Sequence, residues 1–143
     1  MKKLISTALV LFLGWSATAQ ETPIKNTELP AQATGFITKN FSKNTIHHAI
    51  KDTDGSKVTY EVMLDNGTEI EFLADGTWKE VDGKNKAIPT GYIMKPILDY
   101  VKKNYASASI THIDKGLNDI DIDLSNGVEL EFDLKGKFLR IDK

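Results

Sequence analysis

The sequence of 143 residues contains no cysteine, and this absence excludes several classes of site. Disulfide bonds, thiolate nucleophiles, cysteine-ligated metal centres and lipid attachment to an N-terminal cysteine all need a residue that the chain lacks. A chain of this length without disulfides depends on its hydrophobic core, which can bury roughly 65% of the surface of the unfolded chain. We therefore expect one compact unit that is held together by packing.

Positive charge and histidine are also scarce. The chain has 18 Lys and Arg against 20 Asp and Glu, with three His, which gives a net charge of −2. This balance argues against nucleic acid or an anionic membrane as the partner, because both call for a basic face. The sequence contains no glycine-rich phosphate loop and no serine nucleophile elbow. Exposed carboxylates that nothing desolvates are poor general acids, so we expect a protein that is not an enzyme and has no cofactor.

The long apolar run of the chain is confined to its N-terminus. Lys2 and Lys3 precede an apolar segment over residues 4–15, and Ala17-Thr18-Ala19 has the small residues of a cleavage site. This pattern predicts a secretory signal peptide over residues 1–19, cleaved after Ala19, and it is too short for a membrane span. Loss of the two lysines lowers the net charge from −2 to −4. We expect a periplasmic or secreted protein without membrane insertion after cleavage.

The remaining chain contains two copies of one pattern. Residues 20–28 are polar and include Pro23, which predicts a flexible leader. After it, Phe36–Phe41 corresponds to Tyr100–Tyr105, and residues 60–82 correspond to residues 120–142. We interpret this order of matches as a duplication, with repeat 1 over residues 29–83 and repeat 2 over residues 84–143.

Residues 60–72 and 120–132 alternate apolar and acidic side chains, which is the pattern of strands with one buried face. Each segment is interrupted by a turn, at Asp65-Asn66-Gly67 and at Ser125-Asn126-Gly127. A three-residue loop that ends in glycine puts all apolar residues of a hairpin on one face. The predicted pairs are Tyr60 with Phe72, Val62 with Ile70, Ile120 with Phe132, and Ile122 with Leu130.

The next hairpins are predicted to have two-residue turns, at Asp75-Gly76 and at Lys135-Gly136. This register would pair Phe132 with Leu139 and Leu130 with Ile141 on the core face. Each copy also opens with an amphipathic helix. The expected fold class is α+β, in which two tandem α-β-β-β-β modules form a curved antiparallel sheet with the helices packed on one face. The other face would be open to solvent.

Both the helices and the hairpins resemble those of the PepSY-like family, which is related in fold to the β-lactamase inhibitory protein. The matching residues are Phe36, Ile37, Asn40 and Phe41 with residues 60–76, and Tyr100, Val101, Asn104 and Tyr105 with residues 120–136. The resemblance implies two tandem modules in one curved sheet and export to the periplasm or beyond. It further implies binding or inhibition of another protein, and it supplies no catalytic residue.

The open face of the sheet carries the candidate binding site. The predicted registers turn acidic side chains to this face, more densely in the second copy than in the first. They also place two aromatic side chains there, and aromatic residues amid charge are typical of interface hot spots. The partner-binding candidates are Trp78, Phe138, Leu73, Glu61, Glu71, Asp121, Glu131 and Asp133. We expect a protein or peptide of basic character as the partner; the alternative is a solvated face that only discourages aggregation.

A second hypothesis is a cation-binding, in particular calcium-binding, or envelope-stress protein. Its candidate ligands are the carboxylates of the second hairpin, Asp121, Asp123, Glu129 and Glu131. The segment Asp52–Gly55 resembles part of a calcium loop, but Ile50 stands at the first ligand position, which favours a plain turn. His47 and His48 are neighbours on a predicted strand and should point to opposite faces, which argues against a shared metal.

Overall fold

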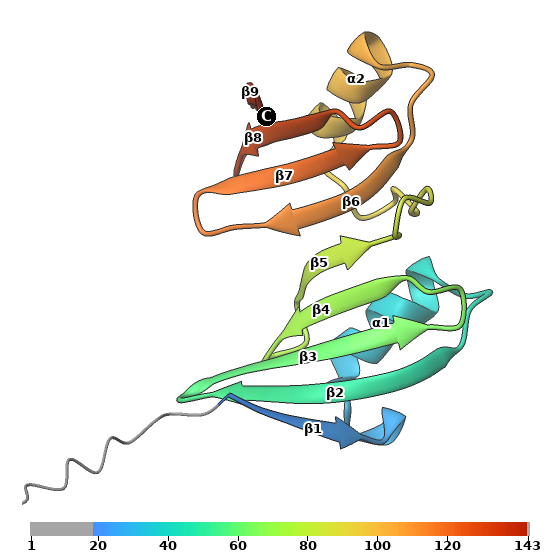
Figure 1. Cartoon of the computed structure of the whole chain (residues 1–143), viewed down its shortest axis with the longest axis vertical. Coiled ribbons are helices and arrows are strands. Elements are labelled where there is room, and N and C mark those ends of the chain that lie inside the picture. Colours follow the sequence, from blue (N-terminus) through green and yellow to red (C-terminus); the bar gives the residue numbers. More distant parts are fainter. Residues whose placement is uncertain (1–18, 143) are drawn as a thin grey trace, which may run out of the picture.

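The computed structural model describes residues 19–142, which form one open antiparallel sheet with helices on one face (Figure 1). The nine strands are β1 (Gln20–Ile24), β2 (Ile46–Asp54), β3 (Lys57–Leu64), β4 (Glu69–Leu73), β5 (Trp78–Asp82), β6 (Ile110–Lys115), β7 (Asp119–Leu124), β8 (Glu129–Asp133) and β9 (Phe138–Asp142). Each strand pairs with the next one in the sequence, from β1 to β9. The predicted signal peptide falls almost entirely outside the described residues.

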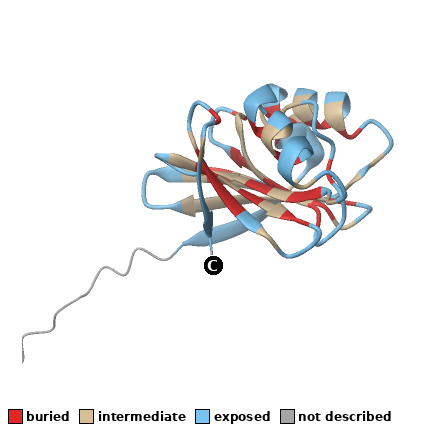
Figure 2. Cartoon of the chain, turned by 90° about the horizontal axis from the view of Figure 1, so that it is seen from above, coloured by how far each residue is buried: buried red, intermediate tan, exposed pale blue. Residues whose placement is uncertain are grey.

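Two α-helices, α1 (Ala31–Asn40) and α2 (Lys95–Asn104), cover the same face of the sheet (Figure 2). Each is followed by four strands, and this arrangement agrees with the predicted α+β class. The duplication itself stays an interpretation of the sequence. Among the described residues, no helix is both long and apolar enough to cross a membrane.

Residues 20–28 differ from the flexible leader that the sequence suggests. Residues 20–24 form β1, which pairs antiparallel with β2, and Asn26–Glu28 form the 3-10 helix η1. The Glu28 carboxylate accepts a hydrogen bond of 2.7 Å from the Lys25 backbone N–H, which is one half of a capping box. Short polar strands carry little hydrophobic signal, because their partner strand rather than their own periodicity holds them in place.

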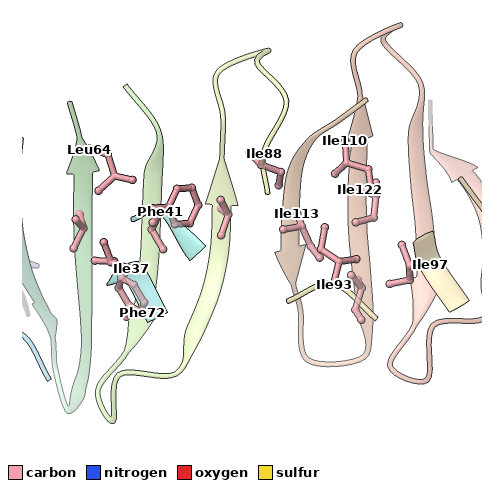
Figure 3. Close-up of a cluster of buried hydrophobic side chains, with 14 of the residues drawn as sticks. Ile37, Phe41, Leu64, Phe72, Ile88, Ile93, Ile97, Ile110, Ile113 and Ile122 are labelled. Carbon is pink, nitrogen blue, oxygen red and sulfur yellow. The ribbon is translucent and has the colours of Figure 1, made fainter. Parts of the chain in front are cut away.

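Each of the two predicted amphipathic helices buries one face in the fold. Ala33 and Ile37 of α1 and Ile97 and Val101 of α2 are at most 6% exposed. Beneath the helices, apolar side chains of β2–β4 and of β6–β8 complete a continuous core (Figure 3). Its largest fully buried side chains include Phe72 in the first half and Phe132 in the second.

The registers of the first hairpin in each half are as predicted. Val62 lies opposite Ile70, and Ile122 lies opposite Leu130. Gly67 and Gly127 have φ values of +85° and +83°, which are the left-handed conformations that a three-residue loop with a glycine bulge requires. The sequence pattern therefore specifies these two turns fully.

The second hairpin of each half was predicted with the wrong turn. The Gly76 N–H donates to the Leu73 carbonyl, and the Gly136 N–H donates to the Asp133 carbonyl, so both loops have three residues like the first pair. A bulge then shifts the register, so that Phe132 pairs with Phe138 rather than with Leu139. The predicted pairing of Leu130 with Ile141 is correct, because the bulge restores the register beyond it.

One short ladder joins the two halves of the sheet. β5 and β6 share three residue pairs, with Val81 opposite Ile113 on the helix face. The loop that leaves β5 lengthens this ladder, because the N–H groups of Gly83 and Ile88 donate to carbonyls of β6. A side chain at Gly83 would collide with the Lys86 carbonyl, so this close approach requires glycine.

Candidate functional site

Charged side chains line the face of the sheet opposite the helices in two parallel rows. Strand pairing brings them into register, with one residue from each of β3–β9 in row one and one from each of β4–β9 in row two. Row one consists of Glu61, Glu71, Glu80, Asp114, Asp121, Glu131 and Arg140. Row two consists of Glu69, Asp82, His112, Asp123, Glu129 and Asp142. Between them runs an apolar row, from Val62 to Leu130, that points into the core. The acidic rows thus follow from the alternation of side chains along the strands, with one-residue bulges in β5, β6 and β9 just before Glu80, His112 and Arg140.

The row-one carboxylates oppose one another as like charges. Glu61 lies opposite Glu71, Glu71 opposite Glu80, and Asp121 opposite Glu131. Partial burial raises the pKa of Glu61 and of Glu71, and acidic neighbours add to that rise, although at Glu71 the charges of Lys79 and Lys57 oppose it. The pKa of Asp121 is raised in the same way, by burial and then by Asp119 and Glu131. Like charges directly opposite each other destabilise a sheet, so row one costs the fold free energy.

A pocket of about 110 Å³ lies over the first half of the rows. Five carboxylates line it together with His48 and Met63; they belong to Glu61, Glu69, Glu71, Glu80 and Asp82. Glu69 and Asp82 are held by the Lys84 ammonium group, 2.7 Å from each. Within residues 19–142, Glu61 and Glu71 have no cation within ion-pair distance. These two carboxylates are therefore the part of the pocket best suited to an added positive charge.

His112 sits where the two halves of the sheet meet. Its Nε2 lies 2.7 Å from Glu80 of β5, and its Nδ1 lies 3.0 Å from Asp123 of β7. Each carboxylate can only accept, so both ring nitrogens donate and the ring is an imidazolium. The hydrogen bond to Glu80 raises the pKa of His112 to about 9, with the charges of Asp123 and Glu80 adding to it. This cation offsets part of the negative charge at the centre of the face.

Two further cations compensate the second half. The Arg140 guanidinium lies 2.7 Å from Glu131, whose side chain is only 8% exposed. The Lys79 ammonium lies 2.9 Å from Asp114 across the β5–β6 joint. Asp133, another predicted binding residue, accepts hydrogen bonds from the backbone N–H groups of Lys135 and Lys137 in the turn that follows β8. These bonds lower the pKa of Asp133.

Trp78 and Phe138 do not lie on the open face, and that prediction is wrong. Trp78 stacks on Phe36 of α1 with ring centroids 5.8 Å apart, and Phe138 stacks on Tyr100 of α2 at 4.4 Å. The three-residue loop and its bulge turn both rings to the helix face. Leu73, a predicted partner-binding residue, lies opposite Thr59 and is 39% exposed. Of the predicted binding residues, the structure brings Glu61, Glu71, Asp121 and Glu131 into one row.

The prediction for His47 and His48 is wrong, whereas the prediction of a plain turn at Asp52–Gly55 agrees with the structure. A bulge in β2 between Ile46 and His48 brings the rings of His47 and His48 together, with Nδ1 atoms 2.9 Å apart, so they do not point to opposite faces. Asp54 and Lys57 close the β2–β3 turn with Gly55 at φ +60°, as expected for a plain turn.

The candidate metal ligands of the second hairpin lie in two pairs, Asp121 opposite Glu131 and Asp123 opposite Glu129. Across residues 19–142, no three His, Asp or Glu side chains come together in a way that could hold a metal ion. Sequence reasoning missed the contributions of Glu80 and Asp82, because these depend on how β5 docks on β6. The alternation of Glu80, Val81 and Asp82 was the available signal.

Comparisons with known proteins place the chain in a family. Residues 58–140 match the family model described as "Putative beta-lactamase-inhibitor-like, PepSY-like". No curated protein matches the chain.

Similar solved structures come from Bacteroides. One, a "putative calcium-regulated periplasmic protein" from Bacteroides thetaiotaomicron, has 36% identity and a TM-score of 0.82, and the match covers 86% of this chain and 97% of that one. A "putative periplasmic protein" from Bacteroides vulgatus ATCC 8482 has 34% identity and a TM-score of 0.82, over 87% and 98% of the two chains. A second one, of unknown function, from the same organism has 31% identity, a TM-score of 0.82, and coverage of 87% and 100%. The chain belongs to the PepSY-like family.

Proposed function

We propose that this protein is an exported, non-enzymatic binding protein whose open sheet face engages a basic segment of another protein or peptide. The observation that carries the proposal is row one, in which six carboxylates from six strands stand side by side. Like-charge pairs of this kind weaken a sheet, and the fold does not require them. Residues that reduce stability in one continuous surface are typical of a site kept for function.

Charge complementarity indicates the chemistry of the partner. Lysine or arginine side chains that lie over the pocket would contact Glu61 and Glu71, neither of which has an ion-pair partner in the described chain. A bound cation relieves the repulsion between these carboxylates, so binding recovers free energy that the free protein lacks. Export is supported by the predicted signal peptide and by the periplasmic proteins among the similar structures.

Calorimetric titration with an oligolysine peptide tests this function. Glu61→Gln together with Glu71→Gln should weaken binding by roughly tenfold, or about 1.4 kcal/mol. The matched control is Glu28→Gln with Asp99→Asn, which removes the same charge from η1 and α2, away from the rows. Equal affinity of the two double variants would show that net charge alone attracts the peptide and would contradict the proposed face.

Calcium binding is the second candidate. One similar structure carries the description "calcium-regulated", and in this chain Asp121 and Glu131 face each other across β7 and β8. Calorimetry with calcium should then show heat that Asp121→Asn plus Glu131→Gln abolishes. Absence of heat at millimolar calcium would remove this candidate and would leave the basic partner unaffected.

A further inference from the structure

β9 is an edge strand of the sheet that residues 19–142 form, and it exposes apolar side chains. Leu139 and Ile141 are 46% and 50% exposed, although Ile141 lies opposite the buried Leu130 on the helix face. An edge of this kind presents unpaired backbone groups and invites pairing with another strand. A bulge disturbs the start of β9, but Arg140–Asp142 continue in regular register.

The opposite edge is protected in a way that β9 is not. β1 is polar apart from Pro23 and Ile24, and Pro23 has no N–H to offer a further strand. β9 contains no proline and ends with the alternation Arg140, Ile141, Asp142. The two edges therefore differ in how readily each accepts a neighbour, and β9 is the receptive one.

The chain already shows what covers an equivalent strand. β5 occupies the same place after α1 as β9 does after α2, and β6 covers it through a three-pair ladder. The central pair of that ladder, Val81 with Ile113, is apolar and buried. Ile141 corresponds to Val81, because each lies opposite the matching core residue of the preceding strand. Thus β9 exposes what β5 buries.

The sequence of β9 is complementary to itself. In an antiparallel pair of two β9 strands centred on Ile141, each Ile141 lies opposite the other on the helix face. Arg140 of each copy then lies opposite Asp142 of the other, on the open face. Opposite charges directly across a ladder stabilise it, whereas a pair centred on Arg140 would set two guanidinium groups against each other.

We propose that β9 pairs antiparallel with β9 of a second copy of this chain, centred on Ile141, to form a two-fold dimer with one continuous sheet. The proposed ladder has three residue pairs, as many as the β5–β6 joint, but it has no adjoining loop that adds further hydrogen bonds. Such a small contact gives a weak dimer, on the order of micromolar or weaker. This proposal does not depend on the function proposed above.

Single cysteines test the register directly, because the chain has none of its own. Ile141→Cys should form a disulfide-linked dimer under mild oxidation, since residues paired across an antiparallel ladder lie within disulfide range. Leu139→Cys is the matched control. Leu139 is about as exposed as Ile141 and lies on the same strand, but in the proposed dimer the two copies of residue 139 lie on opposite sides of the two-fold axis, too far apart for a disulfide. Cross-linking of Ile141→Cys should be roughly tenfold faster or more. Equal rates, or a faster reaction of Leu139→Cys, would overturn the proposal.

Sedimentation equilibrium of the unmodified mature chain provides the second measurement. The wild type should show a reversible monomer–dimer equilibrium, and Ile141→Lys should weaken dimerisation by roughly tenfold or more. A wild type that remains monomeric at millimolar concentration would refute the dimer. Assemblies that grow beyond the dimer would also refute it, since they would indicate head-to-tail pairing of β9 with β1.

Discussion

The two halves of the sheet share an order of elements and differ in what surrounds their last strand. β5 of the first half is covered on both sides, by β4 and β6, and Val81 is fully buried. β9 of the second half has β8 on one side only, and Ile141 is half exposed. The same position is thus buried in the core in one half and exposed at the surface in the other. Its contribution to stability therefore depends on the neighbouring strands rather than on the residue type.

The acidic rows differ between the halves as well. The second half carries more carboxylates, as predicted, but Arg140 and His112 lie among them. The first half carries fewer, yet Glu61 and Glu71 lie there with raised pKa values beside a pocket. The density of acidic residues therefore does not by itself identify the carboxylates that lack an ion-pair partner.

Truncating the stacked aromatic ring of each half should produce the largest loss of stability. Trp78→Ala is expected to cost about 3 kcal/mol and Phe138→Ala about 2 kcal/mol, because Trp78 contacts Phe36 and Tyr92 and also carries the Lys115 ammonium 3.7 Å above its ring. Urea denaturation followed by circular dichroism measures both. Oligolysine affinity should not change in either variant. A loss of affinity in Trp78→Ala without a change of fold would indicate that the Trp78 ring takes part in binding.

Much of the fold was readable because it is local. Alternation over residues 60–72 and 120–132 specifies the faces, and Gly67 and Gly127 specify the loops. The bulge after Gly76 was not readable from alternation, although Leu73-Ala-Asp-Gly-Thr repeats the spacing of Leu64-Asp-Asn-Gly-Thr and could have suggested the same loop. That single bulge decides on which face Trp78 lies.

The candidate site was predictable only within each hairpin. The pairs Glu61–Glu71 and Asp121–Glu131 follow from the turns, and both are as predicted. The middle of the face depends on the β5–β6 joint, whose two strands are separated in the sequence by loops and by α2. No local pattern specifies a register across such a connection. The contacts of His112 with Glu80 and Asp123 could therefore be identified only from the structure.

The covered and uncovered last strands should respond differently to truncation. Val81→Ala should cost about 2 kcal/mol, whereas Ile141→Ala should cost less than about 1 kcal/mol in the dilute protein. Chemical denaturation at low protein concentration, where a weak dimer dissociates, gives both values. Similar costs would mean that β9 is covered even in the monomer.

Replacing the central histidine should have a smaller, pH-dependent effect. His112→Gln is expected to lose about 1–2 kcal/mol near pH 6, because it leaves Glu80 and Asp123 without their cation. The pKa of His112 in the folded state is about 9, above its ordinary value of about 6.5. Its stabilisation is therefore complete below about pH 6.5 and is lost as the pH rises through about 9.

Urea denaturation of wild type and His112→Gln over this pH range measures the difference. The corresponding residue of the first half provides the control, since His48 is exposed and has no carboxylate partner among its hydrogen bonds in the described chain. His48→Gln should change the free energy of unfolding much less than His112→Gln does. If the difference in free energy of unfolding between wild type and His112→Gln were constant across this pH range, it would contradict a charged His112 ring between Glu80 and Asp123.

The smallest expected effect is a gain. Glu71→Gln should stabilise the protein by up to about 1 kcal/mol at neutral pH, because it removes repulsion from both Glu61 and Glu80. The pKa of Glu71 is raised in the folded state, so the gain should shrink as the pH falls through this pKa and the wild-type residue becomes neutral. Thermal denaturation at neutral and acidic pH checks this sign; a destabilised variant would show that Glu71 is compensated, for example by Lys79.

The neighbour-to-neighbour order of the sheet also determines how the chain can assemble. Every strand pairs with the one before it in the sequence, and only two of these pairs are interrupted by a helix, β1–β2 by α1 and β5–β6 by α2. Low sequence separation between contacts favours rapid folding. A chain that emerges N-terminus first from a translocation channel could add strands one at a time onto a growing edge. In that sequence of events, β5 would be the temporary edge until β6 arrives, and β9 the last.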